Sequence, residues 1–198
     1  MPRGGTPGVD PALRSAELFN PDTGAFSPTG PISTKTGGGP MVTLPDGRVF
    51  MATDPAAEIY DPATGTFSAA STMSGSAGHP VVLPDGRVVL FGSTGLYGGG
   101  SITVWDPVSR AFSTSSVPEP LTGATLLDDG RVLLIGMCRE DQAGWTGLYD
   151  SATGATNPGP PTQACRPAST RLADGRVLLA GGTITGDVTA VPTVQVFQ

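Results

Sequence analysis

The chain has 198 residues, of which 38 % are hydrophobic and 14 % are charged, and its formal net charge is −6. Its 29 glycines and 20 prolines are poor helix formers, so the composition favours short strands joined by turns. A nucleic-acid partner would require a basic face, which one lysine, Lys35, and scattered arginines do not supply. No apolar run approaches the roughly 20 residues that span a bilayer.

Residues 13–28 predict the last part of a repeat unit. Phe19 is followed by Asn20-Pro21, and this aromatic residue with a turn signal fits a strand that ends in a tight turn. Residues 16–28 therefore predict two strands, which correspond to the third and fourth strands of the unit that follows.

The complete unit over residues 38–69 predicts four antiparallel strands. Strands at 40–44 and 48–52 flank the turn Pro45-Asp46-Gly47, in which glycine accepts the left-handed conformation after a type I turn. A strand at 57–60 then leads through an aromatic-Asp-Pro turn to the fourth strand. The unit is a four-stranded meander.

The same pattern recurs along the chain. Asp-Gly-Arg-Val occurs four times, at intervals of 39, 44 and 45 residues, and the aromatic turn signal keeps step with it. A period between about 20 and 50 residues indicates a repeat architecture. Further units are expected at residues 77–114, 122–157 and 168–198, all within one domain over residues 1–198.

A single sheet of this length cannot bury both of its faces, so it must stack on copies of itself. Because a radial stack of four-stranded antiparallel sheets is a β-propeller, we predict an all-β propeller of about four repeats. The count fits either an open arc of a larger propeller or a closed four-blade ring. In a ring, the strand near Phe26 would complete the last blade, but a third strand would exist twice, at 17–19 and 194–196. This redundancy favours the open arc.

The repeat resembles the kelch unit of galactose oxidase-type propellers. The resemblance rests on an apolar strand ending in a glycine pair, as at Gly181-Gly182, then the aromatic-Asp-Pro turn, then an aromatic residue on the last strand, as at Phe67. The glycine pair is replaced by Ala52-Thr53 in one unit, and the last aromatic residue by Thr156 in another. Kelch propellers include oxidases, epimerases, adhesive modules and protein adaptors, so the resemblance implies a fold rather than one activity.

The connections at the two ends of such strands differ in kind. The turns after first and third strands are short and alike, whereas the connections after second and fourth strands are longer and differ in every unit. Variable loops on a rigid scaffold are where binding usually resides. An exposed Trp145 beside Arg139 and Asp141 would suit a sugar or peptide platform, but the favoured interpretation is that Trp145 caps its own blade and that these charges are solvated. The candidate binding residues in these loops are Tyr97, Arg139, Asp141, Trp145 and Arg166.

Cys138 and Cys165 both fall in the variable connections. Because these connections lie on one face of neighbouring blades, a disulfide is geometrically compatible with the fold, and it would suit an oxidising compartment. The alternative is a pair of free thiols in a cytoplasmic protein. The sequence leaves both open.

Residues that carry chemistry are few. The resemblance suggests a copper radical oxidase, whose metal site needs two imidazoles. The chain has one histidine, His79, which we expect to line the central channel. The arginines of the Asp-Gly-Arg turns are expected to pair with their own aspartates rather than to bind anions. We expect no catalytic residue, no metal site and no cofactor.

The sequence favours a non-catalytic kelch-repeat interaction module that presents the variable loops of one face to a protein or a carbohydrate. The alternative is a fragment of a galactose or glyoxal oxidase-like copper radical oxidase, or of another kelch-propeller enzyme. We expect no nucleic-acid partner and no membrane span, and a monomer or part of a longer chain. Few lysines and abundant Thr, Ser and Gly favour an extracellular location.

Overall fold

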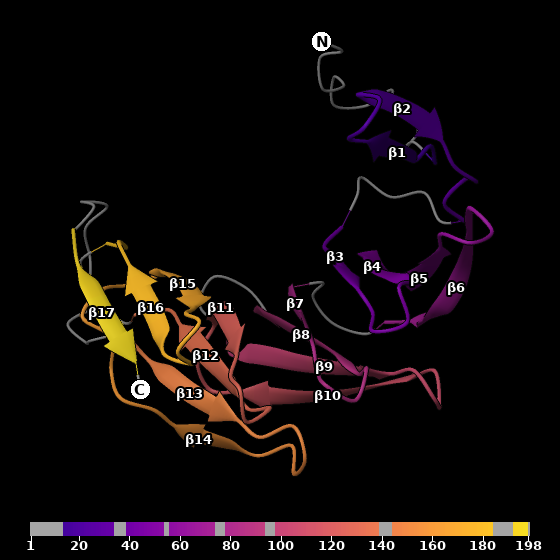
Figure 1. Cartoon of the computed structure of the whole chain (residues 1–198). Helices are drawn as coiled ribbons and strands as arrows, with labels where there is room; N and C mark the ends of the chain where they lie inside the picture. The colour runs from indigo at the N-terminus through magenta and orange to yellow at the C-terminus, as the bar shows by residue number, and fades with distance from the viewer. Residues whose placement is uncertain are drawn as a thin grey trace, which may run out of the picture. The chain divides into compact units, whose positions relative to one another are not determined.

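The computed structural model describes residues 14–33, 39–53, 56–73, 78–93, 98–138, 144–183 and 192–197. Every regular element within these ranges is a β-strand (Figure 1). No helix in the described part of the chain is long and apolar enough to cross a membrane. The chain divides into two compact units, Met1–Met73 and Ser74–Gln198.

The first unit contains an antiparallel hairpin and a four-stranded antiparallel sheet. In the sheet the strands lie in chain order, as a meander requires, and Phe50 and Ile59 are buried. The hairpin is formed by β1 (Glu17–Asn20) and β2 (Ala25–Pro28), and the sheet by β3 (Met41–Thr43), β4 (Val49–Thr53), β5 (Ala56–Asp61) and β6 (Thr66–Thr72).

The second unit contains three antiparallel sheets, two with four strands and one with three, each in sequential order. The first sheet consists of β7 (His79–Val82), β8 (Val88–Ser93), β9 (Gly100–Asp106) and β10 (Ala111–Val117). The second consists of β11 (Leu121–Leu126), β12 (Val132–Gly136), β13 (Thr146–Tyr149) and β14 (Thr156–Pro158), and the third of β15 (Ala168–Arg171), β16 (Val177–Ala180) and β17 (Val194–Phe197).

The Asp-Gly-Arg turns form as the sequence predicts. Between β11 and β12, Gly130 has φ +84°, and the Asp129 carboxylate accepts hydrogen bonds from the backbone N–H of Arg131 at 3.0 Å and from its Nε at 2.7 Å. The hydrogen bond from Arg131 lowers the pKa of Asp129. The predicted local pairing of acid and base is confirmed here and in the three equivalent turns. Those turns contain Asp46 and Arg48, Asp85 and Arg87, and Asp174 and Arg176.

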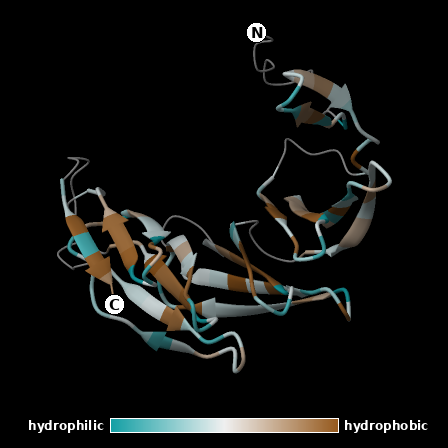
Figure 2. Ribbon diagram, in the orientation of Figure 1, coloured by the Kyte–Doolittle hydropathy of each residue, from teal (hydrophilic) through white to brown (hydrophobic). Residues whose placement is uncertain are grey.

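Alternate residues of β12 are buried against the two neighbouring sheets. Val132 and Leu134 belong to an apolar cluster shared with the sheet β7–β10, whereas Leu133 and Ile135 pack with Val177 of the sheet β15–β17. All four β12 side chains have 0 % exposure, and Figure 2 shows β12 and β16 as strongly hydrophobic strands. The central sheet is therefore covered on both faces, which is the stacking that the repeat predicts.

Candidate functional site

The β14–β15 connection of the second unit is the centre of the candidate site. It spans residues 159–167, whereas the β10–β11 connection, at the same place in the preceding repeat, spans only 118–120. We refer to residues 137–138, 144–145, 159–167 and 181–183 as the loop cluster. These residues come from three connections that lie after second and fourth strands, on the face where the sequence predicts binding.

The β12–β13 loop holds one side of the 159–167 connection. Cys138 and Cys165 form a disulfide with their Cα atoms 5.3 Å apart. Gly144 and Thr162 form an antiparallel bridge, in which each backbone N–H donates to the other residue's carbonyl, at 3.0 and 2.8 Å. A Cβ on Gly144 would overlap the Thr162 hydroxyl, so this approach requires glycine.

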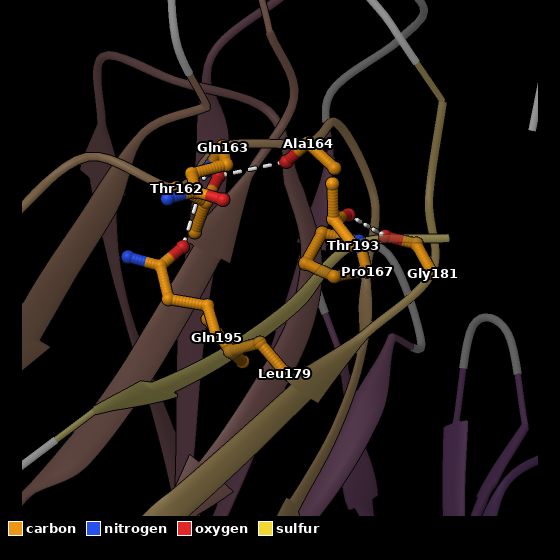
Figure 3. A pocket seen from close by; sticks show the side chains of 8 residues that line it. All are labelled: Thr162, Gln163, Ala164, Pro167, Leu179, Gly181, Thr193 and Gln195. Atoms are coloured by element: carbon orange, nitrogen blue, oxygen red, sulfur yellow. Dashed lines mark hydrogen bonds between the residues drawn. The ribbon is translucent and has the colours of Figure 1, made fainter. Parts of the chain in front are cut away.

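The β16–β17 loop holds the other side. The backbone N–H of Cys165 donates to the carbonyl of Thr183 at 2.9 Å, and the N–H of Thr183 donates back at 3.0 Å. Gly182, with φ +104°, lies so close that a Cβ would overlap the Cys165 carbonyl. The Gln195 side chain accepts a hydrogen bond from the backbone N–H of Gln163 at 3.2 Å (Figure 3). The disulfide and these bridges join the three connections into one surface.

A small hollow lies between the connection and the third sheet. Figure 3 shows Thr162 donating to the Ala164 carbonyl and Thr193 donating to the Gly181 carbonyl at its rim. The hollow has a volume of about 10 Å³, which is space for roughly one water molecule. This hollow is therefore too small for any ligand larger than a water molecule. The lining residues are Thr162, Gln163, Ala164, Pro167, Leu179, Gly181, Thr193 and Gln195.

The predicted site residues have different surroundings. Trp145 is half-buried and packs against the core shared by the first two sheets, and its ring lies within 2.9 Å of where a Gly136 Cβ would be. Arg166 is exposed and belongs to the loop cluster, next to the disulfide. Three further predicted residues, Tyr97, Arg139 and Asp141, lie outside the described residues.

Arg166 has an unusual backbone. Its φ is +51°, which is uncommon for a residue other than glycine and is often a sign of functional constraint. Its Nη2 lies 3.5 Å from the Sδ of Met137, the residue before Cys138. The sequence gives no signal for this conformation, because arginine does not favour it.

Side chains of the types that ligate metals do not gather in the described part of the chain. His79, at the start of β7, is exposed. Among the residues that the structure describes, no group of three or more His, Cys, Asp or Glu side chains could hold a metal ion.

A larger hollow, about 230 Å³, lies on the opposite, short-turn face, between the second and third sheets. Arg131 and Gly175 line it. At the preceding junction, the equivalent Arg87 donates from Nη2 to the Ser151 carbonyl at 2.8 Å, and Ser151 Oγ donates to the carbonyl of Gly130, the equivalent of Gly175. At that preceding junction the β13–β14 turn therefore fills the place that corresponds to this hollow.

Comparison with protein-family models and with curated proteins finds no match. Solved structures do resemble the chain. TolB from Acinetobacter baumannii is 17 % identical over 93 % of this chain, with a TM-score of 0.58. A streptogramin B lyase is 14 % identical over 94 % of this chain, with a TM-score of 0.64. The virginiamycin B lyase from Staphylococcus aureus is 15 % identical over 94 %, with a TM-score of 0.62.

These similarities bear on the fold alone, because every identity is low. Together with the stacked four-stranded antiparallel sheets, they establish a β-propeller built of four-stranded blades. The chain spans 47 % of the TolB chain, 62 % of the streptogramin B lyase and 63 % of the virginiamycin B lyase.

Proposed function

We propose that this chain is a kelch-type propeller segment and a non-catalytic binding module, whose loop cluster contacts a protein or carbohydrate ligand. The observation that carries the proposal is the joining of three variable connections into one surface by a disulfide and two backbone bridges. Pre-organised loops lose less conformational entropy on binding, and this increases affinity. The short-turn face, by contrast, repeats the same self-paired Asp-Gly-Arg turn in each blade.

The surface chemistry of the cluster suits polar recognition. Gln163 and Arg166 are exposed at its centre, and each supplies hydrogen-bond donors on a connection that is fixed at both sides. An arginine donor fork matches carboxylates and other planar acceptors in peptides and acidic sugars. A disulfide at this place also favours an oxidising, extracellular location.

The alternative function, part of a kelch-propeller oxidase, has less support. A copper radical centre needs two imidazoles, whereas the chain contributes a single histidine, His79. The residues present do not fit that metal group, and we derive no catalytic step from them.

The proposal is tested by probing the purified, disulfide-intact chain against a glycan microarray and a displayed random-peptide library. The ligands selected in this way are then titrated against two double variants. Gln163→Ala with Arg166→Ala alters the loop cluster, and Asp129→Asn with Arg131→Gln is the matched control on the short-turn face. We expect at least a tenfold loss of affinity for the first variant and less than a twofold change for the second.

Two results would contradict the proposal. One is that neither the glycan microarray nor the peptide library yields a ligand whose binding saturates. The other is a selected ligand whose affinity changes with the short-turn variant and not with the loop-cluster variant.

A further inference from the structure

One edge of the third sheet has no partner strand among the residues that the structure describes. The other two sheets of the second unit continue in chain order to a fourth strand, whereas the third sheet ends at β17 (Figure 1). The side chains of Val194 and Val196 on β17 are 66 % and 41 % exposed. An uncovered strand edge of this kind offers unpaired backbone N–H and C=O groups to another strand.

The larger hollow, of about 230 Å³, adjoins this edge, because Phe197 of β17 is one of the residues that line it. At the preceding junction the β13–β14 turn lies in the corresponding place. There the Ser151 carbonyl accepts a hydrogen bond from Arg87, whose equivalent in the next blade, Arg131, lines the hollow. The strand edge and the hollow therefore lack the same element, which is a turn followed by a fourth strand.

Residues 20–28 of the first unit are a segment of this kind, since they form the turn after β1 and the strand β2. In the turn, Asn20 Oδ1 accepts a hydrogen bond from the backbone N–H of Asp22 at 2.8 Å. In the β13–β14 turn, Asp150 Oδ1 accepts the equivalent bond from Ala152, also at 2.8 Å. The segment thus begins with the same kind of turn as the one that fills the preceding junction.

The strand of this segment matches the fourth strand of a complete blade. Its residues Ala25-Phe26-Ser27 repeat Ala111-Phe112-Ser113 of β10, in which Phe112 pairs with Trp105 of the third strand. Phe197 of β17 stands in the place of Trp105, because each pairs with the valine that follows the Asp-Gly-Arg turn. The same register would therefore pair Phe26 with Phe197.

The hairpin that holds this strand has little packing of its own. Every residue of β1 and β2 is exposed, and the contacting rings of Phe19 and Phe26 are 54 % and 66 % exposed. A two-stranded hairpin is marginally stable in water, whereas a strand in a sheet of three or more strands is held more firmly. Because β1 pairs with the edge of β2 that a third strand uses, β2 would gain stability by exchanging β1 for β17.

We propose that the β17 edge and the adjoining hollow form a strand-acceptor site, and that residues 20–28 of a second copy of this chain occupy it. The β2 strand of that copy leaves its β1 and pairs antiparallel with β17, and its turn lies in the hollow. The donor segment and the acceptor site are different surfaces, so the contact is heterologous and copies join head to tail. The loop cluster takes no part, so the inference is independent of the proposed function.

Disulfide trapping tests this contact. A chain with Phe26→Cys is mixed with a chain with Phe197→Cys in a glutathione redox buffer, and cross-linked peptides are identified by mass spectrometry. Directly opposed strand residues lie close enough for a disulfide, so we expect a link between positions 26 and 197. Val108→Cys is the matched control for the donor chain, because Val108 is 92 % exposed but lies in the β9–β10 turn. Its yield with Phe197→Cys should be roughly tenfold lower.

Sedimentation of the wild-type chain is the second measurement. The mean sedimentation coefficient should rise over about a hundredfold range of concentration, because association follows mass action. An excess of a synthetic peptide of residues 20–28 should lower it again by occupying β17. Ser27 lies two residues before Thr29, whose N–H donates to the Ala16 carbonyl, so the Ser27 N–H points to the same pairing edge. A peptide with an N-methyl group on Ser27 should therefore compete roughly tenfold less well.

Three results would overturn the proposal. The first is a yield of the 26–197 link no greater than that of the control. The second is a sedimentation coefficient that does not change with concentration, even where the peptide binds, because β17 would then accept a strand of another protein rather than of a second copy. The third is an N-methylated peptide that competes as well as the unmodified one.

Discussion

Replacing both half-cystines with serine, Cys138→Ser with Cys165→Ser, removes a cross-link across a sequence separation of 27 residues. In the chain-entropy description, a loop of this size lowers the entropy of the unfolded chain by about 12 cal/mol/K, or about 3.5 kcal/mol at 25 °C. Most of the native contacts of the loop cluster are backbone bridges that survive the change. The loss therefore arises chiefly in the unfolded state, and we expect the free energy of unfolding to fall by about that amount.

Urea unfolding followed by tryptophan fluorescence is the suitable assay, because Trp105 and Trp145 both lie in the second unit. With an m-value of about 2 kcal/mol/M, the urea midpoint should fall by roughly 1.7 M, and m should rise because the unfolded chain is more expanded without the cross-link. Wild-type protein under reducing conditions is the control and should show the same midpoint as the double variant.

A loss smaller than about 1 kcal/mol would refute the entropic reasoning, since a loop of this length should be worth several times more. Alkylation of native protein without reductant provides the second check. Two modified thiols per chain would show that the cross-link is not formed in solution.

Further predictions concern glycines that lie close to other backbone, an arginine that bonds to the next blade, and the dependence of stability on pH. Gly182→Ala should destabilise the chain by about 2–4 kcal/mol, because it combines a strained φ with a clash against the β14–β15 connection. Gly154→Ala, at φ +74° in open space, should cost only about 1 kcal/mol in the same urea assay. Arg87→Gln should cost about 1 kcal/mol through the lost bond to the next blade. Arg131→Gln, which makes no such bond to the described residues, should cost less than about 0.5 kcal/mol. The pKa of Asp129 is lowered on folding, so its stabilising effect is complete above the unfolded pKa near 4 and is lost as the pH falls further; Asp129→Asn should make the urea midpoint less sensitive to pH between 5 and 2.5.

The strands and turns could be predicted because their determinants are local. The turn Pro45-Asp46-Gly47 contains both its left-handed glycine and its hydrogen-bonding aspartate, and the structure gives Gly47 φ +86°. The third strand predicted at 57–60 extends over Ala56–Asp61, one residue further at each end, because ladder pairing continues until the Asp61 side chain caps the next turn. The repeat then fixed the stacking, since each sheet needs a neighbour on both faces.

The organisation of the loop cluster could not be predicted, because it depends on contacts between distant residues. Apart from Cys138 and Cys165, whose disulfide the sequence left open, Gly144 and Gly182 give the only sequence signal, and a glycine alone does not reveal which backbone approaches it. The sequence makes Arg166 a candidate only because it lies in a variable connection, and nothing in the sequence predicts its left-handed backbone. Ser151 stands where other units have the turn proline, and this marks an irregular unit. The hydrogen bond that its carbonyl accepts from Arg87 depends on how two blades meet, which the sequence does not show.

The Asp-Gly-Arg turn has a consequence for how such a chain grows during evolution. Each turn holds one acid against one base within three residues, so the Asp-Gly-Arg turn of a duplicated module adds no net charge of its own to that rim. Selection can therefore add or remove modules while it diversifies the loops at the far rim. A recurring turn whose charges are paired within it keeps the residues that direct folding apart from the loops that vary between units.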